Sequence, residues 1–173
     1  DRAHGQTGIL LSDNATIYRN VDAELYGVDV EANVKWSGNW NSRFTAAYVR
    51  ATNTTDNRAI AQTPPLEGTA SLEYQQNKWL LGGEVRLVDK QTRVDDNNMT
   101  GSGLDAGQTP GFSVLNFYGS MKVGKDGSLR FGIDNVLDKT YAEHLNKPNA
   151  FDTTANQVNE PGRSVWARIS MKY

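Results

Sequence analysis

The feature that most constrains this chain is a long, strict alternation of apolar and polar residues. From Tyr26 to Trp36 one parity is apolar, and the other holds only polar residues and glycine. A period of two is typical of a β-strand with two unlike faces. The eleven residues of this run exceed the roughly five or six of an ordinary globular strand. They match the roughly 9 to 11 residues that a tilted strand needs to cross a bilayer. The pattern therefore predicts a membrane-crossing strand.

The same alternation recurs down the chain and predicts an all-β, antiparallel fold. No helical period fits over ten residues, and no run of about 18 apolar residues suggests a membrane helix. Together with residues 23–36, the expected strands are 42–51, 65–76, 79–90, 112–123, 128–137 and 165–173. The pattern thus predicts seven strands.

The connections between these strands alternate in length. Three are short turns, "SGNWN", "QN" and "KDG", and three are long and polar, at about 53–64, 94–110 and 143–161. Short turns on one side and long loops on the other are typical of an outer-membrane barrel. Trp36, Trp40, Tyr74 and Trp79 flank the short turns, where they fit an interfacial aromatic belt or, alternatively, ordinary cross-strand pairs.

Composition agrees with such a barrel and excludes several other classes. An apolar content of 38% and a mean hydropathy of -0.61 would suit a soluble domain, but a barrel that turns alternate residues into a polar lumen has a similar average. The absence of cysteine excludes disulfides and thiolate sites. A net charge of -2 without basic clusters argues against nucleic acid as a partner.

The odd number of strands predicts a part of a larger barrel. Bacterial single-chain barrels have even strand numbers, and an open sheet edge is not tolerated in lipid. We therefore expect residues 1–21 to form an extracellular loop with a small hairpin around "GILLSDNATIYRN", and residues 22–173 to be the C-terminal strands of a receptor-sized barrel. A self-contained eight-stranded barrel and a soluble β-sandwich binding module are the alternatives.

Four segments, in the right order and spacing, resemble the C-terminal barrel region of TonB-dependent outer-membrane receptors. They are "LYGVDVEANVKW", "TPPLEGTASLEY", "IDNVLDKTYAEH" and "EPGRSVWARISMKY". The resemblance implies a barrel of about 22 strands, integral in the bacterial outer membrane, with a plug and an energy-coupling box that do not lie in these residues.

Within that family, "YAEHLNKPNAFD", "NEPGR" and "WAR" look most like the copper receptors. The function implied is energy-coupled uptake of a metal or metal complex, with copper as the transported ligand and no resident cofactor. Siderophore uptake and a passive pore or adhesin-type barrel are the alternatives. The implied partners are the remaining strands and plug of the same receptor, the TonB complex, membrane lipid and lipopolysaccharide.

Parity also assigns candidate functional residues. We expect the lumen-facing positions, which in the family would cradle a plug, to be Asp29, Glu31, Lys35, Glu67, Glu73, Glu84 and Arg86. His144, Met99 and His4 are the candidate metal ligands, since imidazole and thioether suit copper. The resemblance also implies that the terminal aromatic strand, through Ile169, Met171 and Tyr173, would serve as the assembly signal.

The remaining motifs are interpreted as structural. Asn135 falls on the apolar parity, so we expect a strand end or bulge there, with Asp134 and Asp138 in turn or lumen hydrogen bonds. Arg163 is expected at the outer rim. The sequence shows no His, Cys or paired carboxylate that a third group would orient for catalysis, so the chain is not expected to be an enzyme.

Overall fold

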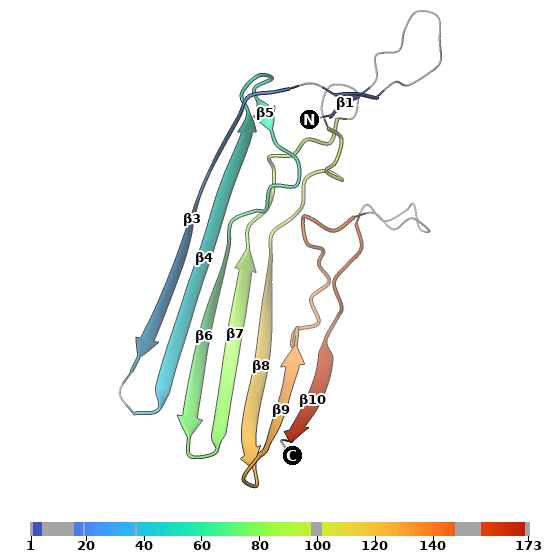
Figure 1. Cartoon of the computed structure of the whole chain (residues 1–173). Coiled ribbons are helices and arrows are strands. Elements are labelled where there is room, and N and C mark those ends of the chain that lie inside the picture. Colours follow the sequence, from blue (N-terminus) through green and yellow to red (C-terminus); the bar gives the residue numbers. More distant parts are fainter. Residues whose placement is uncertain are drawn as a thin grey trace, which may run out of the picture.

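The computed structural model describes residues 2–4, 16–18, 20–36, 38–97, 102–147 and 157–171, and for the first two ranges only the backbone. One antiparallel sheet dominates this part of the chain (Figure 1). Its seven long strands are β3 (Ala23–Lys35), β4 (Trp40–Asn53), β6 (Glu67–Gln76), β7 (Trp79–Val88), β8 (Phe112–Val123), β9 (Gly127–Asp134) and β10 (Ser164–Met171). Across the described ranges, no helix is long and apolar enough to cross a membrane.

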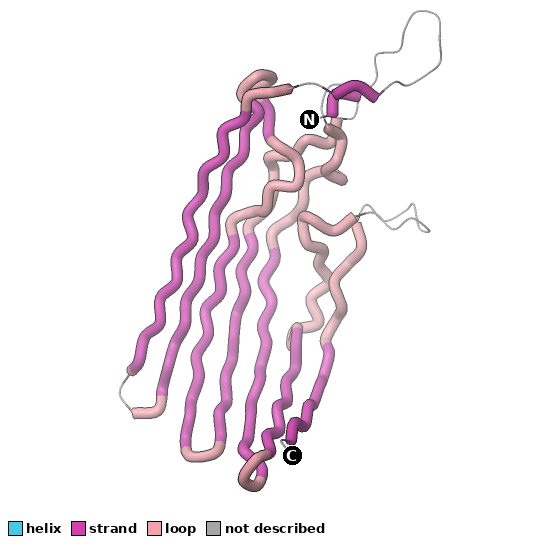
Figure 2. The backbone as a smooth tube through the Cα atoms, in the orientation of Figure 1, coloured by secondary structure: helices cyan, strands magenta, loops and turns pink. Residues whose placement is uncertain are grey.

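The strands follow one another in space in the order in which they occur in the sequence. The path through the sheet is β10-β9-β8-β7-β6-β4-β3, with β5 (Arg58–Ala59) pairing only with the end of β4. Figure 2 shows the three short turns at one end of the sheet and the three long loops at the other. The predicted all-β, antiparallel barrel-type fold and its seven strands are confirmed, and β3 and β10 form the two edges of an open sheet.

A small separate sheet precedes the large one. β1 (Arg2–His4) pairs with β2 (Thr16–Tyr18) in antiparallel fashion. β2 lies in the second half of the predicted hairpin. Its partner is β1, which begins at Arg2 and so precedes the segment "GILLS" that was expected to form the first half. That segment lies outside the described residues.

The pairing register gives the large sheet one continuous apolar face. One row runs across four strands through Ala32, Phe44, Ala70 and Val85, and neighbouring rows keep the same parity. These side chains are not covered by a second layer: Val30 is 56% exposed and Val165 is 77% exposed. An exposed apolar face of this extent marks a surface that contacts a membrane or another protein.

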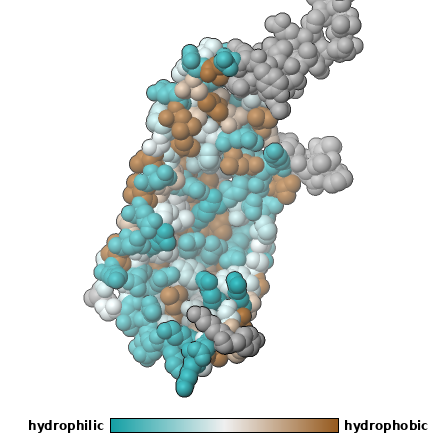
Figure 3. Space-filling model, viewed as in Figure 1, coloured by the Kyte–Doolittle hydropathy of each residue, from teal (hydrophilic) through white to brown (hydrophobic). Residues whose placement is uncertain are grey.

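The opposite face is polar along the strands. Figure 3 shows hydrophilic residues over much of the strand region on the side turned toward the viewer. The buried hydrophobic core of the described residues is correspondingly small. Val88, Phe112 and Val114 pack together with Tyr141 at the long-loop end of β7 and β8. Strand pairing, rather than a two-layer core, therefore holds most of the sheet together.

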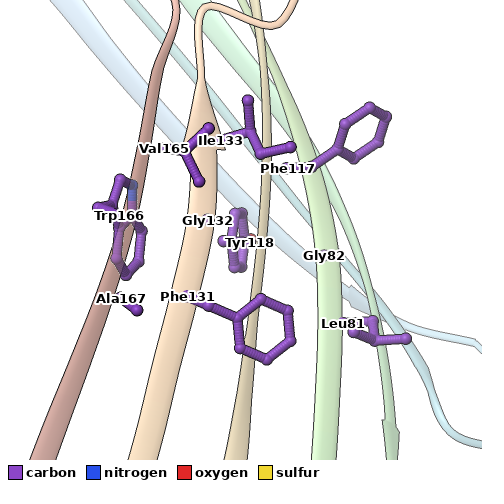
Figure 4. Close-up of a pocket in the computed structure, with 10 residues that line it drawn as sticks. All are labelled: Leu81, Gly82, Phe117, Tyr118, Phe131, Gly132, Ile133, Val165, Trp166 and Ala167. Carbon is purple, nitrogen blue, oxygen red and sulfur yellow. The ribbon is translucent and has the colours of Figure 1, made fainter.

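Aromatic rings lie over glycines of neighbouring strands on both faces. On the polar face, a Cβ built on Gly132 would lie 2.5 Å from the Trp166 ring, and on the apolar face one on Gly119 would lie 2.7 Å from the Phe131 ring. Only glycine leaves room for these rings. Next to them, an apolar hollow of about 720 Å³ crosses β7 to β10 (Figure 4), with Leu81, Phe117, Ile133 and Val165 among its lining residues.

Candidate functional site

The seven polar residues singled out by parity lie on one face of the sheet. Asp29 is opposite Ala47, which is opposite Glu67, and Lys35 is opposite Asn41, which is opposite Glu73. The same parity continues into β7, where Glu84 is opposite Ser71 and Arg86 is opposite Thr69. Glu31 lies between Asp29 and Asn33 on the same face of β3. The register thus brings all seven side chains to one surface, here called the polar face.

At the short-turn end, the polar face carries a network of weak, solvent-exposed interactions. Glu31 accepts hydrogen bonds from Asn33 Nδ2 at 2.8 Å and from Arg43 Nη2 at 3.1 Å. The Glu31 and Arg43 side chains are 49% and 59% exposed, so this ion pair contributes little stability. Further along, the Tyr118 hydroxyl donates to Glu73 at 2.8 Å. A polar hollow of about 460 Å³ lies among these residues, so this part of the face is open to a polar partner.

At the long-loop end of the polar face, Arg86 of β7 links the sheet, which we also call the wall, to a loop. Its guanidinium donates to Glu67 Oε2 through Nε at 3.2 Å and through Nη2 at 2.6 Å. It also donates to both carboxylate oxygens of Glu143, which lies 57 residues away in the loop that follows β9. The Phe112 ring centroid lies 5.5 Å from Arg86 Cζ, which adds a cation–π contact.

Next to Arg86, Tyr141 closes the small core. Its ring centroid is 4.2 Å from that of Phe112. Burial, followed by the nearby carboxylate of Glu160, raises the pKa of Tyr141 above its ordinary value.

His144, the most prominent candidate metal ligand, is buried between two long loops. Its Nδ1 is 3.1 Å from Thr109 Oγ1, and its Nε2 is 3.6 Å from Asp105 Oδ1. The Nε2 atom has no hydrogen-bond partner. Because Thr109 is also buried, this arrangement is closed to solvent and serves to fasten the loops together.

The other two candidate ligands cannot be placed beside His144. Met99 lies outside the described residues, and only the backbone of His4 is described, in β1. Within the described ranges, no group of three His, Cys, Asp or Glu side chains is arranged to hold a metal ion. The metal-ligand assignment therefore stays a prediction.

Two buried carboxylates that the sequence did not single out organise the loop that precedes β8. Asp105 accepts the backbone N–H of Gln62 at 2.7 Å and that of Asp95 at 2.7 Å. Asp95 in turn accepts the Ser102 N–H at 2.8 Å and lies 3.9 Å from Arg58 Nη1. The only sequence signal was the density of Asp and Asn in this loop, which does not identify the partners.

The segment after β9 is a tight structural turn, in line with the expected strand end. β9 ends at Asp134, and Asn135 adopts a left-handed conformation with φ of 49°. Its buried side chain donates to the Lys139 carbonyl and accepts the Lys139 N–H, both at 2.8 Å. Asp138 accepts the Arg163 N–H at 2.8 Å, while the Arg163 guanidinium donates to the Val136 carbonyl. The turn therefore ties the start of β10 to the end of β9.

Two of the three residues predicted to serve as the assembly signal lie at the end of β10. Ile169 and Met171 are exposed, at 70% and 62%, and share the apolar face. Tyr173 lies outside the described residues.

Comparison with known proteins identifies this architecture. The sequence matches a family model described as TonB dependent receptor-like, beta-barrel, over residues 4–136. The structure is similar to that of the copper transporter OprC, with a TM-score of 0.86 and 34% identity, over 99% of this chain and 26% of that one.

Two iron-related structures share the fold at lower identity. A variant of the ferric enterobactin receptor PfeA from Pseudomonas aeruginosa matches with a TM-score of 0.74 and 21% identity, over 100% of this chain and 26% of that one. The FrpB iron transporter from Neisseria meningitidis matches with a TM-score of 0.67 and 17% identity, over 98% of this chain and 26% of that one. The chain thus spans about a quarter of the length of these solved structures. It belongs to the family of TonB-dependent receptor-like β-barrels.

Proposed function

We propose that this chain forms part of the wall of an outer-membrane receptor that imports copper by energy-coupled transport. The apolar face would contact lipid, and the polar face would line the lumen. Support for the membrane position comes from the uncovered apolar face, which continues across all seven long strands. In water such a surface would drive aggregation, whereas lipid covers it without cost.

The observation that carries the choice of copper is the similarity to a copper transporter. Identity to that protein is 34% over nearly the whole chain, whereas the two iron-related structures reach only 21% and 17%. Identities at the lower level support the shared fold alone. Copper is the better-supported substrate for that reason, and a ferric siderophore is the alternative.

The proposed partners follow from the two faces and the two edges. β3 and β10 each have one neighbour within the described sheet, and we place further strands of the same barrel beside them. A plug domain would rest on the polar face, where Glu31, Glu73 and Lys35 offer hydrogen bonds and charge. The TonB complex would act through that plug, while lipid and lipopolysaccharide would cover the apolar face.

We also propose roles for individual residues of the long loops and of the terminal strand. His144, Met99 and His4 remain the candidate copper ligands of the long loops. For His144 a metal ion could use only Nε2, because Thr109 occupies Nδ1, and the loops would have to open to expose that buried atom. Ile169, Met171 and Tyr173 would serve as the assembly signal. The proposed mechanism needs no catalytic residue, because the transport energy would come through the plug.

The test is copper accumulation by cells that lack the full-length receptor and then regain it. We expect copper accumulation to return with the receptor and to be lost again when energy coupling is disabled. Growth on a ferric siderophore, measured in the same strains, should not depend on the receptor. Restored iron-dependent growth without any change in copper would contradict the choice of copper. Accumulation that persists without energy coupling would indicate a passive pore.

A further inference from the structure

Three side chains within four residues dock one long loop on the barrel wall. The loop follows β9, and we call residues 141–144 the docking segment. Tyr141 packs on the small core that contains Phe112, Glu143 binds Arg86, and His144 is buried against Thr109. Arg86 and Phe112 belong to β7 and β8, so the loop is fixed to the sheet and not only to other loops.

The docking segment is part of a preassembled unit. Gln157 Nε2 donates to the carbonyls of Glu143 at 3.2 Å, His144 at 2.8 Å and Asn146 at 3.0 Å. The Glu160 N–H donates to the Tyr141 carbonyl at 2.9 Å. These bonds lie within the loop and do not involve the wall, so residues 141–147 and 157–160 can leave the wall together without breaking them.

Arg86 is shared between a carboxylate of the wall and a carboxylate of the loop. Glu67 keeps two hydrogen bonds from Arg86, at 3.2 and 2.6 Å, that do not depend on Glu143. Leaving a buried charge without a partner is what makes a buried ion pair costly to break. Here release of Glu143 leaves Arg86 paired with Glu67, and the Arg86 side chain is already 29% exposed. Undocking therefore does not leave an unpaired cation on the wall.

We propose that the docking segment is a releasable latch that holds the loop after β9 against the polar face. Arg86 is its positioning residue, bound to Glu67 in both states and to Glu143 only when the latch is closed. When the latch is closed, residues 141–147 and 157–160 stay against the long-loop end of the polar face. It depends on these contacts and on no particular substrate, so its failure would leave the proposed transport function intact.

Hydrogen exchange on the full-length protein in detergent tests this latch. The Glu143→Gln variant loses the negative charge that binds Arg86 and keeps the shape of the side chain. We expect amides of residues 141–147 and 157–160 to exchange about tenfold faster. A tenfold change corresponds to about 1.4 kcal/mol, and this energy lies near the low end of the range for a hydrogen bond to a charged group. Protection in β7 and β8 should stay unchanged, which also shows that the variant is folded.

Two further variants make the test specific. Glu67→Gln should leave exchange in the docking segment unchanged or slower, because Arg86 then has Glu143 alone. Glu73→Gln, on the same face but bound to Tyr118, is the matched control and should have no effect on the loop. Unchanged exchange in Glu143→Gln, or opening in Glu67→Gln as large as in Glu143→Gln, would overturn the proposal.

Discussion

An arginine on the apolar face of β3 should cost far more than an arginine on the polar face of the same strand. Val30 is 56% exposed and lies five residues before the end of β3 at Lys35. At about 3.4 Å per residue that is roughly 17 Å along the strand, or about 12 Å of depth at a tilt of 45°. This is about half of an apolar band some 25 Å tall, so Val30 sits near the proposed bilayer midplane.

The expected cost of Val30→Arg is therefore roughly 2–4 kcal/mol, which lowers the ratio of folded to unfolded protein roughly 30- to 700-fold. Asn33→Arg is the matched control. Asn33 lies on the polar face opposite Arg43, with Glu31 within hydrogen-bond distance of both. A new arginine there would face one like charge and one opposite charge, and we expect a cost below about 1 kcal/mol.

The assay is equilibrium refolding of the full-length protein into lipid vesicles across a denaturant series, monitored by tryptophan fluorescence. The midpoint should fall strongly for Val30→Arg and little for Asn33→Arg. Equal shifts in the two variants would refute the assignment of the two faces.

Two other substitutions test local features of the same sheet. Asn135→Ala should cost roughly 2–4 kcal/mol in denaturant melts, because it removes the buried partner of Lys139 and because alanine tolerates the left-handed conformation less well than asparagine does. Asn135→Gly should recover about 1 kcal/mol of this loss, and equal losses in the two variants would exclude the backbone contribution. Gly132→Ala should lower the free energy of unfolding by roughly 1–3 kcal/mol, because the new Cβ displaces the Trp166 ring. A second change, Trp166→Ala, should reduce that loss. An undiminished loss in the double variant would show that the ring is not the obstacle.

The strands were predictable because side chains in a strand keep a period of two whatever lies beyond them. The alternation from Tyr26 to Trp36 predicts β3 to within a few residues at each end. The alternation in residues 42–51 is less regular, yet β4 is the longest of the described strands. Ala47 and Val49 interrupt its alternation with apolar residues on the polar face, but pairing with both β3 and β6 holds it in place.

The loop contacts were not predictable because they depend on partners far apart in the sequence and on no period. Arg86 was assigned to the polar face by parity, yet nothing in the sequence indicated its bond to Glu143. His144 was singled out for its chemistry as a ligand, whereas its neighbours Thr109 and Asp105 lay in a loop that offered only composition. Asn135 was the exception, because a polar residue on the apolar parity indicated the strand end that the structure contains.

The central claim is that the apolar face of the sheet contacts lipid and the polar face lines the lumen. The chain contains no cysteine, so single cysteines placed at successive positions from Tyr26 to Lys35 can be labelled in outer membranes that hold the full-length protein. A charged, membrane-impermeant thiol reagent should label the odd-numbered positions through the lumen, and a lipid-soluble reagent the even-numbered ones, in strict alternation. Uniform labelling by the charged reagent, or alternation of the opposite parity, would contradict the account.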